Sequence, residues 1–132
     1  MIQLNSFSYL FTPEILVTGD KNCLYYVFDC RFIKNPGRID SLKDFSGLDK
    51  EIEDFFRIET NMISYLEDVY RIIKMAMDTY LIEDRYTNIQ INFGCTGGIH
   101  RSVFAVKFIE GKLKEDFPKE SLSIKHKRLS KI

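Results

Sequence analysis

The segment INFGCTGGIHRS, residues 91–102, places three glycines, a histidine, an arginine and a serine within one short stretch. Before its glycines, residues 88–94 alternate polar and apolar side chains with a period of two, which predicts a β-strand. After them, apolar side chains recur at a spacing that suggests a helix (Val103, Phe104, Val106, Phe108, Ile109 and Leu113). A strand that leads into a helix through a glycine-rich loop, here residues 94–102, is typical of α/β domains, and it restricts the fold more than any other feature.

Other segments predict the remaining elements. Residues 60–81 carry apolar side chains at three-four spacing over about six turns, the strongest helical pattern in the chain. A short helix is expected to run through Phe56, capped by Ser46 or Asp49. Strands are expected at residues 2–11 with a bulge at Asn5–Ser6, at residues 24–29 as a central strand covered on both faces, and at residues 121–126. We therefore predict a single α/β domain over residues 1–132, with a small central sheet of about four strands flanked by helices.

The glycine-rich loop has the composition of an anion-binding site. Glycines let the backbone approach a ligand closely, and the first turn of the following helix offers free N–H groups and a positive dipole end. Arginine adds a planar fork for two phosphate oxygens, and histidine adds a donor whose charge changes near neutral pH. We predict that a phosphoryl or carboxylate group is bound by Thr96, Gly97, Gly98, His100, Arg101 and Ser102. The loop has neither the lysine of a Walker loop nor the glycine order of a dinucleotide loop.

The same loop also fits a catalytic pattern. Cys95, five further residues, then Arg101 and Ser102 resemble the phosphate loop of cysteine-dependent protein tyrosine phosphatases, where the cysteine is the nucleophile. A cysteine at a helix N-terminus beside an arginine is chemically suited to this role, although Cys95 could equally be a small side chain that fits a tight loop. The chain departs from the pattern at Gly94, where those enzymes have histidine. The sequence does not define the general acid, for which the candidates are Asp29 and Asp49.

Asp29 and Arg31 end the second predicted strand, two positions apart and therefore on the same side. Ligands of α/β sheets gather beyond the carboxyl ends of the strands, so both side chains could face the glycine-rich loop. Asp29 would then hold a ligand hydroxyl or ammonium group while Arg31 and Arg101 share the phosphate; the alternative is a structural ion pair. Asn35 is more often a turn former than a ligand contact, and His126 fits either an interior position or a pocket.

Several segments resemble one known family. Residues 94–102 read GCTGGIHRS, and the chain also contains SFSY (6–9), FDCRFIKNP (28–36), SGLD (46–49) and IKHKRLSK (124–131). In this order and spacing the segments resemble the C-terminal domain of the RapZ family of RNase adapter proteins, whose hallmark is GCTGGxHRS. The likeness runs from residue 6 to residue 131. Two departures stand out: the Walker-type N-terminal domain of the family has no counterpart here, so we expect no Walker nucleotide site, and Gly37 replaces a histidine that many relatives carry.

This resemblance implies a function. The family is described as nucleotide-binding, and its C-terminal domain contacts RNA and ribonuclease E and senses glucosamine-6-phosphate. We therefore expect a sensor or adapter rather than an enzyme, with a phosphatase as the alternative. The expected ligand is a phosphorylated metabolite, either an amino-sugar phosphate such as glucosamine-6-phosphate or a nucleotide such as ATP. RNA and a ribonuclease are the candidate macromolecular partners, and no cofactor is expected.

Because the numbers of acidic and basic residues are equal, any affinity for nucleic acid must come from a local cluster of basic side chains. The chain has 19 basic and 19 acidic residues, so it has no global attraction to nucleic acid. The candidate RNA-binding residues near the end of the chain are Lys125, Lys127, Arg128 and Lys131, although such a basic segment is commonly just solvated.

Cysteine usage and hydropathy point to an ordinary intracellular protein. The three cysteines are odd in number and widely spaced, which argues against a disulfide framework and against a zinc site. We see no signal peptide and no apolar run near the ~20 residues of a membrane span. We expect a cytoplasmic bacterial protein without membrane contact or bound metal, and the sequence leaves a homo-oligomer open.

Overall fold

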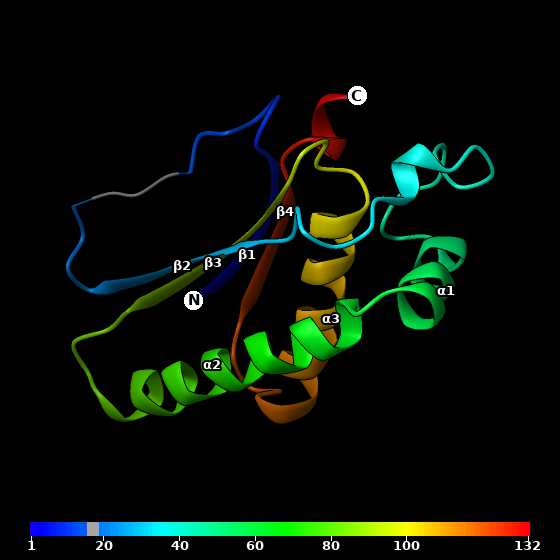
Figure 1. Cartoon of the computed structure of the whole chain (residues 1–132). Coiled ribbons are helices and arrows are strands. Elements are labelled where there is room, and N and C mark those ends of the chain that lie inside the picture. Colours follow the sequence, from blue (N-terminus) through cyan, green and yellow to red (C-terminus); the bar gives the residue numbers. More distant parts are fainter. Residues whose placement is uncertain (16–18) are drawn as a thin grey trace.

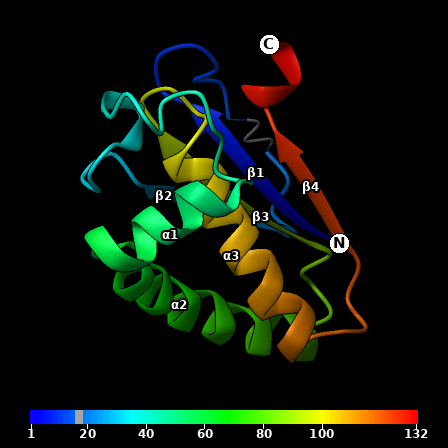
Figure 2. The same cartoon turned by 90° about the vertical axis from the view of Figure 1, so that its right-hand side faces the viewer.

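A computed structural model describes residues 1–15 and 19–132 of the chain. Four parallel strands form one sheet in the order β2-β3-β1-β4, with bounds β1 Ile2–Ser8, β2 Cys23–Asp29, β3 Asn88–Cys95 and β4 Leu122–His126. Three helices, α1 (Lys50–Glu59), α2 (Met62–Ile82) and α3 (Arg101–Asp116), cover one face of this sheet (Figure 1; Figure 2). Two short 3-10 helices, η1 (Pro36–Arg38) and η2 (Leu129–Lys131), lie in the connections. The predicted α/β class and four-stranded sheet are confirmed.

The period-two alternation decides which side of the sheet each residue occupies. Apolar positions of the central strands face the helices and are buried there (Ile2, Leu4, Ile89, Ile91 and Phe93). Burying one such side chain stabilises the fold by about 1.5–3 kcal/mol. The alternate positions carry amides that bond to one another on the other face: Asn5 Nδ2 donates to Asn92 Oδ1 at 3.0 Å, and Asn92 Nδ2 donates to Gln90 Oε1 at 3.0 Å. The strand prediction for residues 88–94 is confirmed.

Three details of the predicted strands are wrong. The first strand ends at Ser8 rather than Phe11, and the exposed Phe11 lies in the connection that follows it. No bulge occurs at Asn5–Ser6, because β1 pairs with β3 in unbroken register from Ile2 to Ser8. The apolar segment 24–29 forms β2 at the edge of the sheet, so it is not a central strand. Its apolar character is explained by the side chains that pack onto the core from one face, while Val27 on the other is exposed.

The helices agree with the sequence patterns. The three-four spacing predicted at residues 60–81 is the helix α2, whose apolar face packs into the core. Helix α1 begins after Asp49, but the Asp49 side chain caps no helical N–H; it accepts a hydrogen bond from the Ser46 backbone at 2.7 Å instead. The less regular apolar pattern after the glycines is α3, which is buried on several sides because β1, β3 and α2 all pack against it.

Candidate functional site

Because all four strands are parallel, their carboxyl ends meet at one edge of the sheet. At this edge Ser8 pairs with Cys95, and Asp29 pairs with Gly94. Residues 96–100 then connect β3 to α3 (Figure 1). The glycine-rich loop therefore lies between the ends of neighbouring strands and the first turn of the helix at the centre of the core.

The loop wraps around the side chain of Cys95. The sulfur accepts hydrogen bonds from the backbone N–H groups of Gly98 (3.3 Å) and Ser102 (3.4 Å), and the thiol donates to Ser102 Oγ (3.2 Å). Cys95 and Ser102 are both buried. The sequence predicts the Ser102 hydroxyl as a donor to the bound anion, but the structure directs it to Cys95, because Ser102 faces the interior of the loop. Two N–H groups and one hydroxyl thus surround the sulfur and would stabilise negative charge on it.

Four backbone amides of the loop have no partner. The N–H groups of Thr96, Gly97, Ile99 and His100 meet no hydrogen-bond acceptor within residues 1–15 and 19–132. A cavity of about 150 Å³, which we call the loop cavity, lies beside Gly97, Ile99 and His100; its lining is Asn35, Gly37, Cys95, Gly97, Gly98, Ile99, His100 and Arg101. Free N–H groups beside one small cavity at a helix N-terminus are the arrangement that binds phosphate and other oxyanions.

Arg101 supplies the charge of the site. Its side chain is only 5% exposed, and Nη1 donates to the carbonyl oxygens of Arg31 (2.6 Å) and Ile33 (2.9 Å). Through these two bonds Nη1 holds the guanidinium against the segment that follows β2. Nε is buried without a partner, and Nη2 has none in the described part of the chain. A buried arginine with uncommitted donors is costly unless an anion completes its hydrogen bonds.

A second cavity of about 300 Å³ adjoins the first, since Asn35 and Arg101 line both. We call it the arginine cavity, and its lining is Arg31, Ile33, Asn35, Arg38, Thr96 and Arg101. Three of these six side chains are arginines, and none of the lining residues is acidic. The structure therefore brings Arg31, Thr96 and Arg101 together as predicted, and it adds Arg38, which the sequence patterns do not single out.

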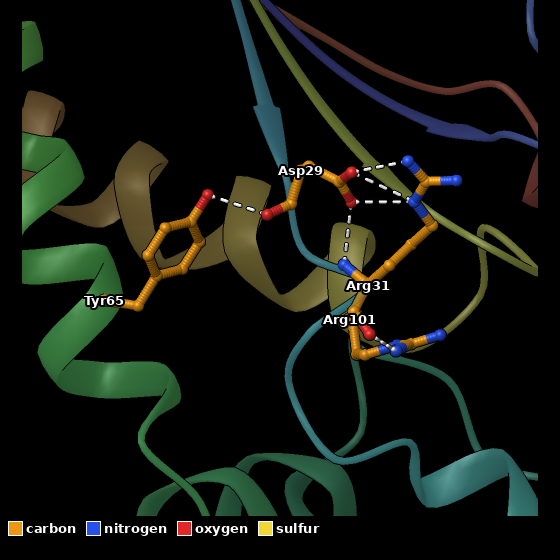
Figure 3. Close-up of polar contacts among 4 residues, drawn as sticks. All are labelled: Asp29, Arg31, Tyr65 and Arg101. Atoms are coloured by element: carbon orange, nitrogen blue, oxygen red, sulfur yellow. Dashed lines mark hydrogen bonds and ion pairs between the residues drawn. The ribbon is translucent and has the colours of Figure 1, made fainter.

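Asp29 and Arg31 form the ion pair that the sequence leaves as an alternative (Figure 3). Arg31 Nη2 lies 2.7 Å from Asp29 Oδ2, Nε donates to both carboxylate oxygens at 3.0 Å, and the Arg31 guanidinium covers the Tyr9 ring at 3.9 Å. The hydrogen bonds from Arg31 hold the pKa of the Asp29 carboxyl below its usual value. Asp29 is therefore already neutralised by a cation, which leaves little of its charge for a ligand ammonium group.

Of the remaining residues predicted for the pocket, Asn35 and His100 line a cavity and His126 does not. Asn35 has both predicted properties: its Oδ1 accepts from the Gly37 backbone at 2.9 Å in a turn, and it lines both cavities. His100 lines the loop cavity, its Nε2 lies 3.2 Å from the Lys43 carbonyl oxygen, and burial lowers its pKa. His126 lines neither cavity; its Nδ1 lies 2.8 Å from Ser6 Oγ on β1, and burial lowers its pKa too. His126 is half-buried on the edge strand β4 and bonded within the sheet, so it takes an interior or rim position rather than a pocket position.

Two glycines of the loop have no substitute. Gly98 has a φ of +72°, and a Cβ at this position would lie 2.8 Å from Ser8 Cβ and 2.9 Å from Arg128 Cβ. A Cβ at Gly94 would lie 2.4 Å from the Phe7 ring. This explains why the position that holds histidine in the phosphatase pattern holds glycine here: the rings of Phe7 and Tyr9 occupy the space.

Three supporting residues escaped the sequence prediction. Ser8 is buried, and its Oγ donates to the Thr96 carbonyl oxygen at 2.5 Å. Gly47 donates its N–H to the Ile99 carbonyl oxygen at 2.8 Å. Tyr65 on α2 donates its hydroxyl to the Asp29 carbonyl oxygen at 2.9 Å (Figure 3). Ser8 and Gly47 lie in the segments SFSY and SGLD, whose likeness to the family could have pointed to them. For Tyr65 the sequence shows only the helical pattern, which does not indicate a contact with Asp29.

The predicted RNA-binding residues separate into two groups. Lys125 and Lys127 line a polar hollow of about 240 Å³ on the sheet, and the pKa of Lys127 is lowered by burial and by the nearby charges of Lys125 and Lys131. Lys127 Nζ also donates to the Glu14 carbonyl oxygen at 2.7 Å. Arg128 instead turns to the Phe11 ring at 4.3 Å, and its Nε is buried without a partner. The charges of Lys125 and Lys131 act on Lys127, opposed by the charge of Glu14, and we call Lys125, Lys127 and Lys131 the lysine cluster.

The described residues contain neither a candidate metal site nor a candidate membrane-spanning helix. Within the described ranges, His, Cys, Asp and Glu side chains form no group of three or more that could hold a metal ion. Among the same residues, no helix combines the length and the apolar character needed to cross a membrane.

The chain was also compared with known proteins. The family model described as RapZ C-terminal domain matches residues 1–130. A nucleotide-binding protein of Thermotoga sp. (strain RQ2) is 34% identical over 109 residues, which cover 81% of this chain and 37% of that protein. One from Psychrobacter sp. (strain PRwf-1) is 31% identical over 127 residues, covering 96% and 38%. One from Clostridium novyi (strain NT) is 41% identical over 92 residues, covering 67% and 30%. The chain thus spans 30–38% of the length of these three relatives.

Proposed function

The chain belongs to the RapZ C-terminal domain family, and from this membership and the site geometry we propose that it binds a phosphorylated small molecule at the glycine-rich loop. One observation carries the proposal. Four loop amides without acceptors and the uncommitted donors of Arg101 lie around two adjoining cavities. A phosphate in the loop cavity would accept from these groups and compensate the buried positive charge.

The arginine cavity would hold the rest of the ligand. Its cations are Arg31, Arg38 and Arg101, and Asp29 offsets the charge of only one of them. This environment favours a ligand whose remaining polar groups are hydroxyls or anions. A nucleotide meets this condition, in keeping with the relatives that are named nucleotide-binding proteins. An amino-sugar phosphate such as glucosamine-6-phosphate meets it through its phosphate and hydroxyls, while its ammonium group would have to compete with Arg31 for Asp29.

Calorimetric titration tests the proposal. The ligand panel is inorganic phosphate, glucosamine-6-phosphate, glucosamine, ATP and ADP, and only the phosphate-bearing compounds should bind. Arg101→Ala should weaken phosphate binding about 10- to 100-fold, because hydrogen bonds to a charged group contribute about 1.5–3 kcal/mol. Arg57→Ala is the control, since Arg57 lies on α1 in an ion pair with Glu53.

Since Arg101 also holds two carbonyl groups, Arg101→Ala is first compared with native protein by thermal unfolding. Gly97→Val is the second variant: a Cβ there meets nothing within 4 Å, so the added side chain should reduce the volume of the loop cavity without disturbing the fold. Phosphate binding that is absent in native protein, or unchanged in both variants, contradicts the proposal.

A phosphatase is the second candidate function, and the surroundings of the Cys95 sulfur favour it. Two N–H groups and the Ser102 hydroxyl would stabilise a Cys95 thiolate beside the loop cavity. The thiolate would attack phosphorus, the ester P–O bond would break and release the alkoxide or phenoxide, and water would then cleave the S–P bond of the phosphocysteine to give inorganic phosphate and the thiol. Neither suggested general acid is well placed: Asp29 is paired with Arg31, and Asp49 is bonded to Ser46 and lines neither cavity.

Without a proton donor, such an enzyme would cleave only esters with good leaving groups. The assay therefore uses p-nitrophenyl phosphate with native protein, Cys95→Ser and Cys23→Ser. Turnover that disappears in Cys95→Ser alone supports the phosphatase. Absence of turnover in native protein eliminates it and leaves the binding function.

An adapter role is the third part of the proposal. The cluster of Lys125, Lys127 and Lys131 provides a local excess of positive charge in a chain that is neutral overall. Such a cluster would contact RNA phosphates. A sensor of this kind would bind its metabolite at the carboxyl edge of the sheet and its RNA or ribonuclease partner through β4 and the residues that follow it.

A further inference from the structure

Two of the three cysteines occupy neighbouring positions across the sheet. Asp29 of β2 pairs with Gly94 of β3, and the next residue, Cys30, donates its N–H to the Gly94 carbonyl oxygen at 2.8 Å. Cys30, the first residue after β2, therefore lies beside Cys95, the last residue of β3. Adjacent strands lie about 4.8 Å apart, which falls within the range of Cα separations that a disulfide requires.

Both side chains also lie on the same face. Phe28 and Phe93 are partners in the register, and their rings stack at a centroid distance of 5.5 Å. Cys95 follows Phe93 by two positions within β3, so its side chain returns to the same face. Cys30 follows Phe28 by two positions, directly after the end of β2, and belongs to the same core cluster as Phe93 and Cys95. Both cysteines belong to the buried core, at 0% and 2% exposure.

The two thiols have opposite chemical surroundings. The Cys95 sulfur accepts hydrogen bonds from the N–H groups of Gly98 and Ser102, and Cys95 lines the loop cavity, so a small solute can approach its sulfur there. Cys30 lines neither cavity, and burial raises the pKa of its thiol well above the ordinary value. A reactive cysteine beside a protected one is the arrangement of an attacking and a resolving thiol.

We infer that Cys95 and Cys30 are a modification site, at which a peroxide converts them to a disulfide that closes the anion site. The Cys95 thiolate attacks one peroxide oxygen; an S–O bond forms, the O–O bond breaks, and hydroxide leaves and is protonated to water. The Cys30 sulfur then attacks the resulting sulfenic acid; an S–S bond forms, the S–O bond breaks, and a second water leaves with the Cys30 proton. Two thiols are oxidised by two electrons, and one hydrogen peroxide is reduced to two waters.

The expected consequence rests on the proposed phosphate binding. A bond to Cys30 draws the Cys95 sulfur away from Gly98 and Ser102, whose N–H groups then lose their acceptor. The loop that these contacts hold would rearrange, and Gly97, Ile99 and His100 would no longer line the loop cavity. Oxidised protein should therefore bind phosphate at least about tenfold more weakly than reduced protein, which corresponds to about 1.4 kcal/mol.

The test treats the native chain with hydrogen peroxide, blocks free thiols by alkylation, and identifies peptides by mass spectrometry without reduction. The expected result is a Cys30–Cys95 linked peptide that dithiothreitol cleaves, with Cys23 alkylated. Cys23→Ser should behave as native. Cys30→Ala should carry Cys95 on to the sulfinic acid, because no resolving thiol is present. A native chain in which Cys95 stays alkylated, or is over-oxidised without a linked peptide, overturns the inference.

Phosphate titration of both redox forms separates this inference from the proposed function. If the linked peptide forms but oxidised and reduced protein bind phosphate equally, closure of the anion site is wrong and the modification site stands. If reduced native protein does not bind phosphate, the proposed function fails, while the mass-spectrometric result still decides the disulfide.

Discussion

The backbone N–H of Gly47 donates a hydrogen bond to the Ile99 carbonyl oxygen at 2.8 Å, which fastens the SGLD turn to the glycine-rich loop. A Cβ at position 47 would lie 2.4 Å from the Phe104 N atom and 2.5 Å from the His100 carbonyl oxygen. Both contacts are with backbone, so neither can yield by a change of rotamer. The turn and the loop therefore depend on one another for their position.

Gly47→Ala should lower the free energy of unfolding by about 1–3 kcal/mol, because the methyl group overpacks this junction. It should also weaken phosphate binding, since the turn at residue 47 must move away from His100 and the start of α3, which border the anion site. Urea denaturation and phosphate titration measure the two effects. Gly111→Ala is the matched control: it lies exposed on α3 with nothing near its Cβ, and the change should stabilise the fold by about 1 kcal/mol. If the Gly47→Ala protein is as stable as native, the close contact between the turn and the loop does not require glycine at this position.

Gly97 and Gly98 should respond differently to alanine. Gly98→Ala places a side chain in the left-handed region and against Ser8, so we expect a loss of stability of about 1–2 kcal/mol from the backbone conformation alone. Gly97→Ala meets no neighbour, so its stability should stay near native, while its methyl group should reduce phosphate affinity at the loop cavity. Unfolding curves and phosphate titrations of the pair provide the comparison. Native affinity in Gly97→Ala would argue against this cavity as the phosphate site.

His126 should make the fold sensitive to mild acid. Burial lowers its pKa in the folded state, although Glu110 acts in the opposite direction, and the unfolded chain titrates near about 6.5. Between these values the unfolded state binds more protons, so stability falls as the pH is lowered through this range. His100, whose pKa is lowered as well, contributes with the same sign.

We expect the free energy of unfolding to decrease between pH 7.5 and pH 5.5, and to decrease less steeply in His126→Gln. The pKa values of Asp29 and Glu53 are lowered, so these carboxylates lose their contribution to stability only below this pH range. The change in stability between pH 7.5 and pH 5.5 therefore comes mainly from the histidines. Equilibrium unfolding at several pH values is the measurement. Parallel native and variant profiles would show that His126 is not the group responsible.

The lysine cluster should set the salt dependence of any RNA binding. Replacing Lys125, Lys127 and Lys131 by alanine should weaken binding and reduce the slope of log K against log salt by about 2, since each contact with single-stranded nucleic acid contributes about 0.7. Replacing Lys50, Lys74 and Lys114, which form ion pairs on the helical side, is the control. Gel-shift titrations at several salt concentrations would reveal equal slopes if the cluster has no part in binding.

Much of the fold follows from local patterns. The alternation at residues 88–94, the three-four spacing at 60–81 and the glycines before α3 each depend on neighbours in the chain, so the sequence predicts β3, α2 and the loop between strand and helix. The anion site was predicted from the same loop. The edge position of β2 was not predicted. Residues 24–29 are apolar enough for a central strand, and only the long-range pairing of the strands places them at an edge.

The sequence by itself determined the elements, the family likeness and the donor groups of residues 96–101, because periodicity and loop chemistry act over a few residues. Only the tertiary structure decided which groups meet. It paired Asp29 with Arg31, turned Ser102 toward Cys95, held Arg101 on the carbonyls of residues 31 and 33, and set Cys30 beside Cys95. The contacts of Arg101 and Cys30 join the segment after β2 to α3 and β3, whose relative position depends on how the strands are ordered in the sheet, and local sequence patterns do not specify that order. The contacts of Asp29 with Arg31 and of Ser102 with Cys95 are close in sequence, and the conformation of the loops decides them.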